Sequence, residues 1–169
     1  MSSFHQDLKE YRKHLGKGTI QRAYQGLMEY LMGLRSYFEK KYPAYSVSGS
    51  IYQGYMDMTY FSFFPESLKR RRLKVGIVFV HQSFRFEVWL FGYNKGVQAQ
   101  YWKLFKDSGW NKYRIPSTTK GVDSILEGIL VDNPDFSDLD TLTKQIERET
   151  LEFIGDVEHF LSKAHIQKL

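Results

Sequence analysis

The sequence predicts an α+β fold in which helices at both ends of the chain pack on an antiparallel sheet of about four strands. Apolar residues recur every three to four positions in the first 42 residues and again after residue 137, as they do on one face of a helix. Between residues 45 and 92 they alternate instead, as in strands. A chain of 169 residues with 42% hydrophobic content can bury one core, so we expect a single domain over residues 1–169.

The N-terminal part predicts two helices that pack against the sheet. Ser3 is placed to cap the first helix, which Gly16 and Gly18 end. Thr19 then caps a longer helix that ends before Pro43, because the residue before proline disfavours the helical conformation.

Two consecutive hairpins are expected to form the sheet. The first spans residues 45–64 and turns at Gln53-Gly54, since a glycine supplies the positive φ that a two-residue turn requires. In this register Tyr52 faces Tyr55, and Asp57 faces a serine on the opposite strand.

The second hairpin spans residues 73–94 and turns at residues 82–83. Its register puts the apolar residues on one face and Arg85, Glu87 and Trp89 on the other. Trp89 would cover a strand glycine, which leaves room for the indole ring. The expected pairs are Val75–Leu90, Ile77–Val88 and Phe79–Phe86 on the apolar face, and Val80–Arg85, Val78–Glu87 and Gly76–Trp89 on the other.

Three further helices are expected after the second hairpin. Asn94 is placed to cap the first of them, which Gly109 closes. A short helix is predicted over residues 119–131. Ser137 and Asp140 then form a capping-box pattern that opens a long amphipathic helix.

Composition limits the classes of function. The chain has no Cys, which excludes disulfides and thiolate chemistry and suits the reducing cytoplasm, where we expect the protein to reside. Neither a signal peptide nor a membrane span is indicated. The five His residues are scattered, so no metal or other cofactor is predicted. A net charge of +5 is modest, and nucleic acid is therefore not the favoured partner, although residues 69–74 (KRRRLK) form a basic cluster.

A polar and aromatic face of the sheet is the predicted binding site. Tyr, Trp and Arg side chains on this face offer rings for stacking together with positive charge, which suits a small anionic ligand or a protein partner. The loop GWNKYRIPS would form the rim, unless its aromatic residues anchor it to the core. The predicted binding residues are Tyr52, Tyr55, Arg85, Trp89, Trp110, Lys112 and Arg114.

A metal-dependent hydrolase, resembling nucleases, is the alternative interpretation. Asp57 and Glu87 are weak candidates for a catalytic pair, because two acids on adjacent strands can share a hard cation. The lysine that restriction-type nucleases place two residues after the second acid is replaced by Trp89. The competing interpretation is structural, with Glu87 paired to Arg85.

Several stretches carry a family resemblance over nearly the whole chain: YMDMTYFSFFP, RFEVWLFGYNK, YWKLFK, SGWNKYRIPSTTKGVDSI and ILVDNPDFSDLDTLTKQIE. With these stretches the sequence resembles a family of small, uncharacterised bacterial proteins known only as a domain of unknown function. The resemblance implies a stand-alone cytoplasmic protein of bacterial origin and assigns no catalytic residue. A non-enzymatic binding or interaction module is thus the leading expectation, ahead of the hydrolase and of a non-specific nucleic-acid binder.

Overall fold

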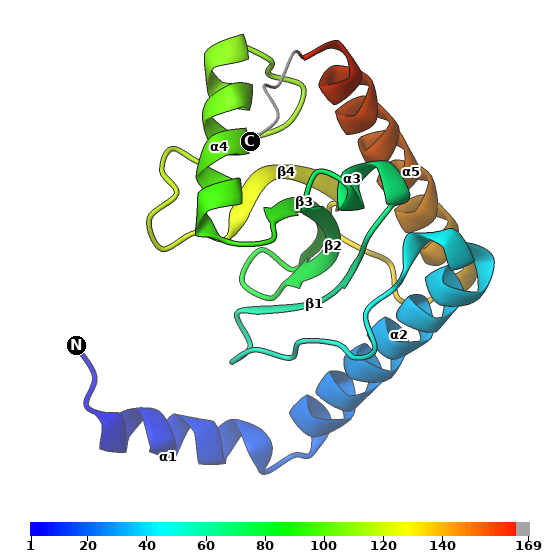
Figure 1. The fold of residues 1–169 in the computed structure, drawn as a ribbon. Helices are drawn as coiled ribbons and strands as arrows, with labels where there is room; N and C mark the ends of the chain where they lie inside the picture. The colour runs from blue at the N-terminus through cyan, green and yellow to red at the C-terminus, as the bar shows by residue number, and fades with distance from the viewer. Residues whose placement is uncertain (165–169) are drawn as a thin grey trace.

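The computed structural model describes residues 1–164 and confirms the α+β class (Figure 1). Within these residues a four-stranded antiparallel sheet in the order β1-β2-β3-β4 is combined with five α-helices. The strands are β1 (Met58–Phe63), β2 (Leu73–Val80), β3 (Arg85–Gly92) and β4 (Ser124–Val131). The helices are α1 (Phe4–Leu15), α2 (Thr19–Lys41), α3 (Glu66–Lys69), α4 (Lys95–Ser108) and α5 (Leu139–Lys163), with a 3-10 turn η1 (Pro43–Tyr45) after α2.

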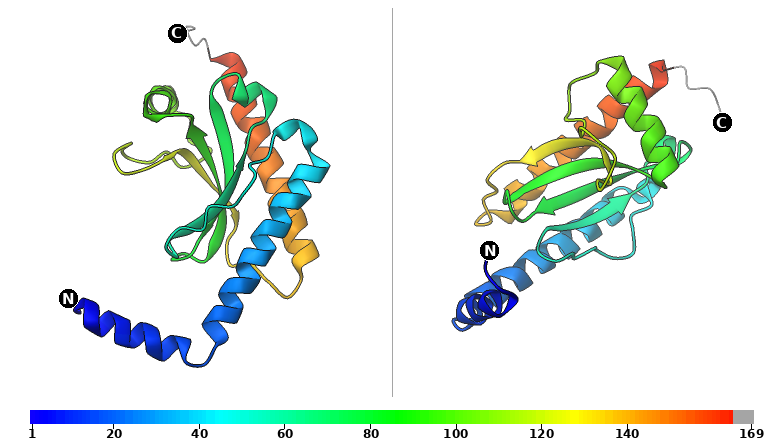
Figure 2. Two further views of the ribbon diagram at one scale, coloured as in Figure 1. Left: turned by 60° about the horizontal axis from the view of Figure 1, so that its bottom comes forward. Right: turned by 90° about the vertical axis from the view of Figure 1, so that its left-hand side faces the viewer.

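Helices α2 and α5 cover one face of the sheet, while α4 lies on the opposite side (Figure 2). The core forms between the sheet and these two long helices, because each contributes a stripe of apolar residues at helical spacing. Phe38 of α2, Phe61 of β1, Phe79 of β2 and Phe153 of α5 are among the fully buried side chains. The described residues contain no helix that is both long and apolar enough to cross a bilayer.

The second hairpin forms with the predicted register. All six expected pairs between β2 and β3 are present. Phe86, Val88 and Leu90 therefore face the core, while Arg85, Glu87 and Trp89 face the other side of the sheet.

The prediction of a first hairpin over residues 45–64 is wrong. Only β1 forms a regular strand there. The segment before it runs beside β1 in another register, through the bridge between Tyr52 and Tyr60 and through backbone hydrogen bonds from Ser48 to Ser62 and from Phe64 to Tyr45. Tyr52 therefore does not face Tyr55. A local hydrogen bond competes with the hairpin, because Oδ1 of Asp57 accepts from the backbone N–H of Tyr55 at 2.9 Å. Met56, between these two residues, takes a positive φ of 60°, which turns the chain again before β1 begins.

The predicted helix over residues 119–131 is also wrong, since this segment contains β4, which completes the sheet beside β3. Its sequence SILEGILV is a short apolar run that suits a buried strand. Gly128 allows the close contact here: an added Cβ would lie 3.0 Å from Cδ1 of Tyr113 and 3.1 Å from Cγ1 of Val88.

The predicted helix caps are confirmed in part. Ser3 forms a capping box with Gln6, and Asn94 caps α4, which ends at Gly109 as predicted. The cap of α2 is Gly18 rather than Thr19. The cap of α5 is Asp138 rather than the predicted Ser137, and it accepts from the backbone N–H of Thr141.

Helix α1 was expected to pack against the sheet, but it does not. None of its residues is buried, and it extends away from the body of the molecule (Figures 1 and 2). Only α2 of the N-terminal pair contributes to the core.

Candidate functional site

Glu87 is the centre of the predicted polar face, and the structure surrounds it with donors from its own strand. Its Oε1 accepts from Nε of Arg85 at 2.7 Å, and its Oε2 accepts from Nε1 of Trp89 at 2.6 Å. The Glu87 residue is only 5% exposed. Both carboxylate oxygens therefore have a partner, as the structural interpretation of the sequence expected.

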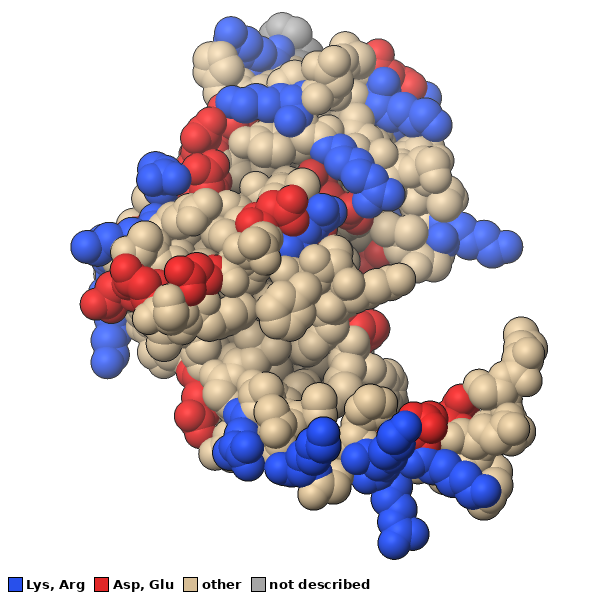
Figure 3. Space-filling model, turned by 180° about the vertical axis from the view of Figure 1, so that it is seen from behind, with Lys and Arg blue, Asp and Glu red and all other residues tan. Residues whose placement is uncertain are grey.

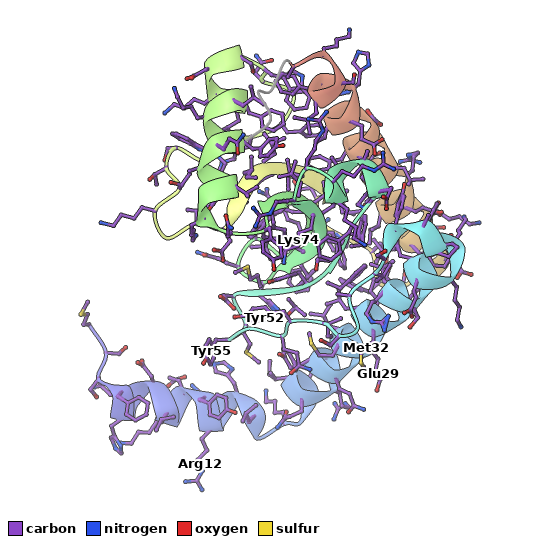
Figure 4. All side chains as sticks on the ribbon, viewed as in Figure 1. Arg12, Glu29, Met32, Tyr52, Tyr55 and Lys74 are labelled. Atoms are coloured by element: carbon purple, nitrogen blue, oxygen red, sulfur yellow. The ribbon has the colours of Figure 1, made fainter. Side chains whose placement is uncertain are left out.

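A row of aromatic rings crosses the same face of the sheet. The centroid distances are 5.9 Å from Trp89 to Phe91, 5.5 Å from Phe91 to Tyr60 and 5.1 Å from Tyr60 to Tyr52. Tyr55 lies outside this row, at the tip of the loop before β1, and is 95% exposed (Figure 4). Tyr52 and Trp89 thus share a surface, whereas Tyr55 does not contribute to it.

Trp110 and Lys112 lie elsewhere, against α4 and α5. The indole ring of Trp110 stacks on Phe105 at 5.3 Å and on Phe160 at 4.9 Å. Nζ of Lys112 is 2.7 Å from a carboxylate oxygen of Asp156. The loop is anchored by its aromatic side chains, so Trp110 and Lys112 do not form a rim with Arg85 and Trp89.

Arg114 does approach the polar face, because residue 114 pairs with Glu127 at the outer edge of β4. The two side chains also form an ion pair. A hollow of about 310 Å³, here called the sheet-face pocket, lies beside them. Its lining consists of Met58, Trp89, Arg114, Pro116, Ser117, Thr118, Gly121, Val122, Asp123 and Glu127.

Asp57 and Glu87 are not placed to share a cation. Glu87 pairs through Val78 with Tyr60, two strands away, and Asp57 precedes Tyr60 by three residues. These steps put the two Cα atoms about 14 Å apart. Across residues 1–164 no group of three or more Asp, Glu and His side chains is arranged to hold a metal ion.

An apolar hollow that was not predicted lies along α2. One part, of about 600 Å³, is bounded by the first half of α2, the loop at Met56, the β2–β3 turn and Phe136. A second part, of about 690 Å³, continues between α2 and the start of α5. The two parts meet at Gly26, Tyr30 and Leu139, where the hydroxyl of Tyr30 lies 2.9 Å from that of Thr143 on α5, and together they are here called the α2 groove.

The floor of the α2 groove is shaped by two glycines of α2. Gly26 and Gly33 are seven residues apart and therefore lie on the same side of the helix. Nothing lies within 4 Å of a Cβ added at either position. Side chains that rise beside this floor remain partly exposed although they are apolar, including Ile20, Met56, Phe84 and Leu139. An open apolar surface of this kind is typical of a binding site.

His81 is the polar group at one end of the groove. Thr59 donates its hydroxyl hydrogen to the carbonyl of Gln53 at 2.9 Å, so its oxygen accepts from Nε2 of His81, also at 2.9 Å. Burial lowers the pKa of His81, and the nearby Asp57 carboxylate offsets this shift only in part. The ring is therefore neutral at pH 7, and its Nδ1 is left as an acceptor.

Acidic side chains border the groove on the α5 side. Residues 132–140 contain four aspartates and no Lys or Arg. Opposite charges gather at the other end of α2: Figure 3 shows Lys and Arg side chains along the lower edge of the molecule, where α1 joins α2. The same view shows the open space between α1 and the body.

A signal for the groove was present in the sequence. Two glycines seven residues apart weaken a helix, and they interrupt the periodic pattern of α2 without ending it. Such glycines indicate a surface that another segment approaches closely. The remaining walls come from the loop at Met56 and from Phe84 and Phe136, which no local pattern links to α2.

The chain belongs to the family described as Domain of unknown function (DUF7000), whose model matches residues 4–161. The resemblance to a domain of unknown function, inferred from the sequence, is thus confirmed. Searches of curated proteins and of solved structures found no match.

Proposed function

We propose that this protein is a non-enzymatic interaction module that binds an amphipathic helix in the α2 groove. The observation that carries the proposal is the pair of adjoining hollows along α2, with glycines in their floor and volumes of about 600 and 690 Å³. Helix-in-groove recognition uses this arrangement, in which apolar side chains of the bound helix enter a groove beside a helix of the receptor.

The shape and charge of the groove favour a helix as the ligand. The lining of the groove runs from Ile20 to Tyr37, which corresponds to about 25 Å of helix. Because acidic residues border one side, the bound helix is expected to carry Lys or Arg beside its apolar stripe. Nδ1 of His81 can accept a hydrogen bond from a donor side chain at the end of the apolar stripe of the bound helix.

Binding is favoured over catalysis because the polar side chains at the groove do not present a free nucleophile. Thr59 is fully buried and its hydroxyl donates to a backbone carbonyl, so its contact with His81 does not present a nucleophile to the groove. The originally expected anionic ligand is less favoured, because Arg85, Lys112 and Arg114 each already pair with a carboxylate.

A peptide of about 12 Leu and Lys residues, arranged as an amphipathic helix and labelled with fluorescein, tests the proposal. We expect saturable binding by fluorescence anisotropy, weakened about tenfold by Gly26→Leu, which fills the floor. Gly155→Leu is the matched control, since Gly155 is also an exposed helical glycine with open space around it. Equal affinity in the two variants would contradict the assignment of the groove.

The sheet-face pocket is a second candidate site, for a small anionic ligand. It is favoured by the ring of Trp89 and the guanidinium of Arg114, which both line the pocket; the Arg114 side chain stays 71% exposed in its ion pair with Glu127. Arg114→Gln should abolish binding of such a ligand while leaving the peptide titration unchanged, which separates the two sites. Inorganic phosphate and benzoate, followed by chemical shifts of the pocket residues, are suitable probes.

We also propose a cytoplasmic location, which the lack of cysteine supports. Nucleic acid is not the proposed partner, because the arginines of the cluster at residues 69–74 are engaged within the protein. Their contacts are Arg70 Nε with Glu66, Arg71 Nη2 with the carbonyl of Leu161, and Arg72 over the ring of Tyr93.

A further inference from the structure

We infer that the helix bound in the α2 groove is α1 of a second copy of this chain, so that two copies exchange their N-terminal helices. The inference rests on the proposed function and names its partner.

Helix α1 carries an apolar stripe that no other part of residues 1–164 buries. Phe4, Leu8 and Tyr11 follow helical spacing on one side, and they are 77%, 47% and 58% exposed. A stripe of this size on a surface helix indicates an interaction site, since a helix this short is marginal in water without packing.

The length of α1 suits the groove. Its 12 residues correspond to about 18 Å of helix, which is shorter than the groove of about 25 Å. The floor at Gly26 and Gly33 lets a second helix approach closely, and the phenol of Tyr11 is a donor that can meet a neutral acceptor such as His81.

The charges of the two surfaces are complementary along the border of the groove formed by residues 132–140, whereas Arg22 and Lys144 line other parts of it. Residues 4–18 contain four Lys or Arg side chains against two acids. The segment at residues 132–140 that borders the groove has only acidic charges. The basic side chains of an incoming α1 would therefore lie beside carboxylates, which also selects against a helix of opposite charge pattern.

The junction between α1 and α2 directs α1 away from the groove of its own chain. Nε2 of Gln21 donates to the carbonyl of Leu15 at 2.9 Å, and the backbone N–H of Gly18 donates to the same carbonyl at 3.0 Å. In Figure 4 the helix lies well apart from the body, and Arg12 points outward from it. A helix held in this way can reach a neighbouring molecule more readily than its own α2.

A two-fold arrangement satisfies both copies at once. Each chain offers one helix and one groove, so the contact is made twice and the assembly closes as a dimer.

Sedimentation equilibrium of the full chain at about 1 to 100 µM tests the inference. We expect a dimer whose dissociation constant rises about tenfold or more in Leu8→Gln and in Gly26→Leu. Gly155→Leu, at the exposed glycine of α5 outside the groove, is the matched control and should change it by no more than about twofold. A wild-type chain that stays monomeric, or a dimer insensitive to Leu8→Gln, would overturn the inference.

Mixing the two disruptive variants gives a sharper result. The Gly26→Leu chain keeps an intact α1, and the Leu8→Gln chain keeps an open groove, so together they can rebuild one of the two contacts. Each homodimer has both contacts disrupted and the heterodimer only one, so we expect the mixture to form a heterodimer more tightly than either variant forms a homodimer, although less tightly than the wild type. A merely structural effect of the substitutions would give no such rescue and would count against the exchange.

The Leu and Lys peptide separates this inference from the function on which it rests. If the Leu8→Gln chain binds the peptide but the wild-type chain is monomeric, the groove binds helices and the self-association is refuted. If the peptide does not bind the Leu8→Gln chain, the proposed function itself fails.

Discussion

Replacing Glu147 of α5 by Gln should lower the free energy of unfolding by about 2–3 kcal/mol. Glu147 is nearly buried between α5 and α2 and accepts from three side chains. The donors are the hydroxyls of Tyr37, at 2.7 Å, and Tyr42, together with Nζ of Lys41, at 2.7 Å. The three donors join the end of α2 to the middle of α5.

The magnitude follows from the change of charge at constant shape. A hydrogen bond to a carboxylate is worth about 1.5–3 kcal/mol and one to a neutral group about 0.5–1.5 kcal/mol, so each phenol bond should lose about 1 kcal/mol. Lys41 is half exposed, and its ion pair adds less than about 1 kcal/mol. Urea denaturation followed by circular dichroism measures the sum.

The pH dependence provides a second test of the same substitution. Burial tends to raise the pKa of Glu147, but hydrogen bonds from Lys41, Tyr42 and Tyr37 outweigh it, so the pKa lies below its ordinary value. A carboxyl whose pKa is lowered by folding stabilises the protein above its unfolded pKa, and this contribution is lost as the pH falls through the folded pKa. The difference between wild type and Glu147→Gln should thus shrink toward about pH 3.

Glu152→Gln, also on α5, is the control for this prediction. The Glu152 side chain is exposed and lies 3.6 Å from Nζ of Lys112, so its loss should cost less than about 0.5 kcal/mol. If the Glu147 and Glu152 variants unfold at the same urea concentration, the three-donor contact does not stabilise the fold and the reasoning is refuted.

Gly92→Ala should destabilise the fold by about 1–3 kcal/mol, because the added Cβ would lie 2.5 Å from the backbone nitrogen of Gln98; Gly49→Ala, which has open space, should cost far less in the same urea titration. Stability should fall as the pH drops below about 6.5, because the unfolded chain takes up a proton that folded His81 resists. The change of unfolding free energy with pH should be smaller in His81→Gln. An unchanged pH dependence in this variant would show that other groups cause it. Thr59→Val should destabilise by about 1–3 kcal/mol in thermal melts, since it leaves Nε2 of His81 without its acceptor, and wild-type stability in this variant would contradict that role.

The elements that the sequence predicts well are those whose signals are local and consistent. The pairing of β2 with β3 follows from alternation on both sides of a short turn, and α4 follows from its caps at Asn94 and Gly109. The helix predicted over residues 119–131 was wrong because a short apolar run fits either element. Its β-branched residues and the eight-residue length of β4 would have favoured a strand.

The site could be predicted only where its residues share a strand. Arg85, Glu87 and Trp89 lie together because alternate residues of one strand face the same side. Trp110 was misplaced, since its partner Phe160 is 50 residues away in the sequence and no spacing rule connects them. The α2 groove was missed for the same reason, because its walls come from four segments that are separate in the sequence.

Both outer edges of the sheet are partly covered by short, irregular pairings. The segment before β1 bonds to it at Tyr60 and Ser62, and Arg114 bonds to Glu127 along β4. These pairings occupy backbone groups that would otherwise be open to a strand from another molecule. A strand added at these positions would first have to displace the chain's own bonds.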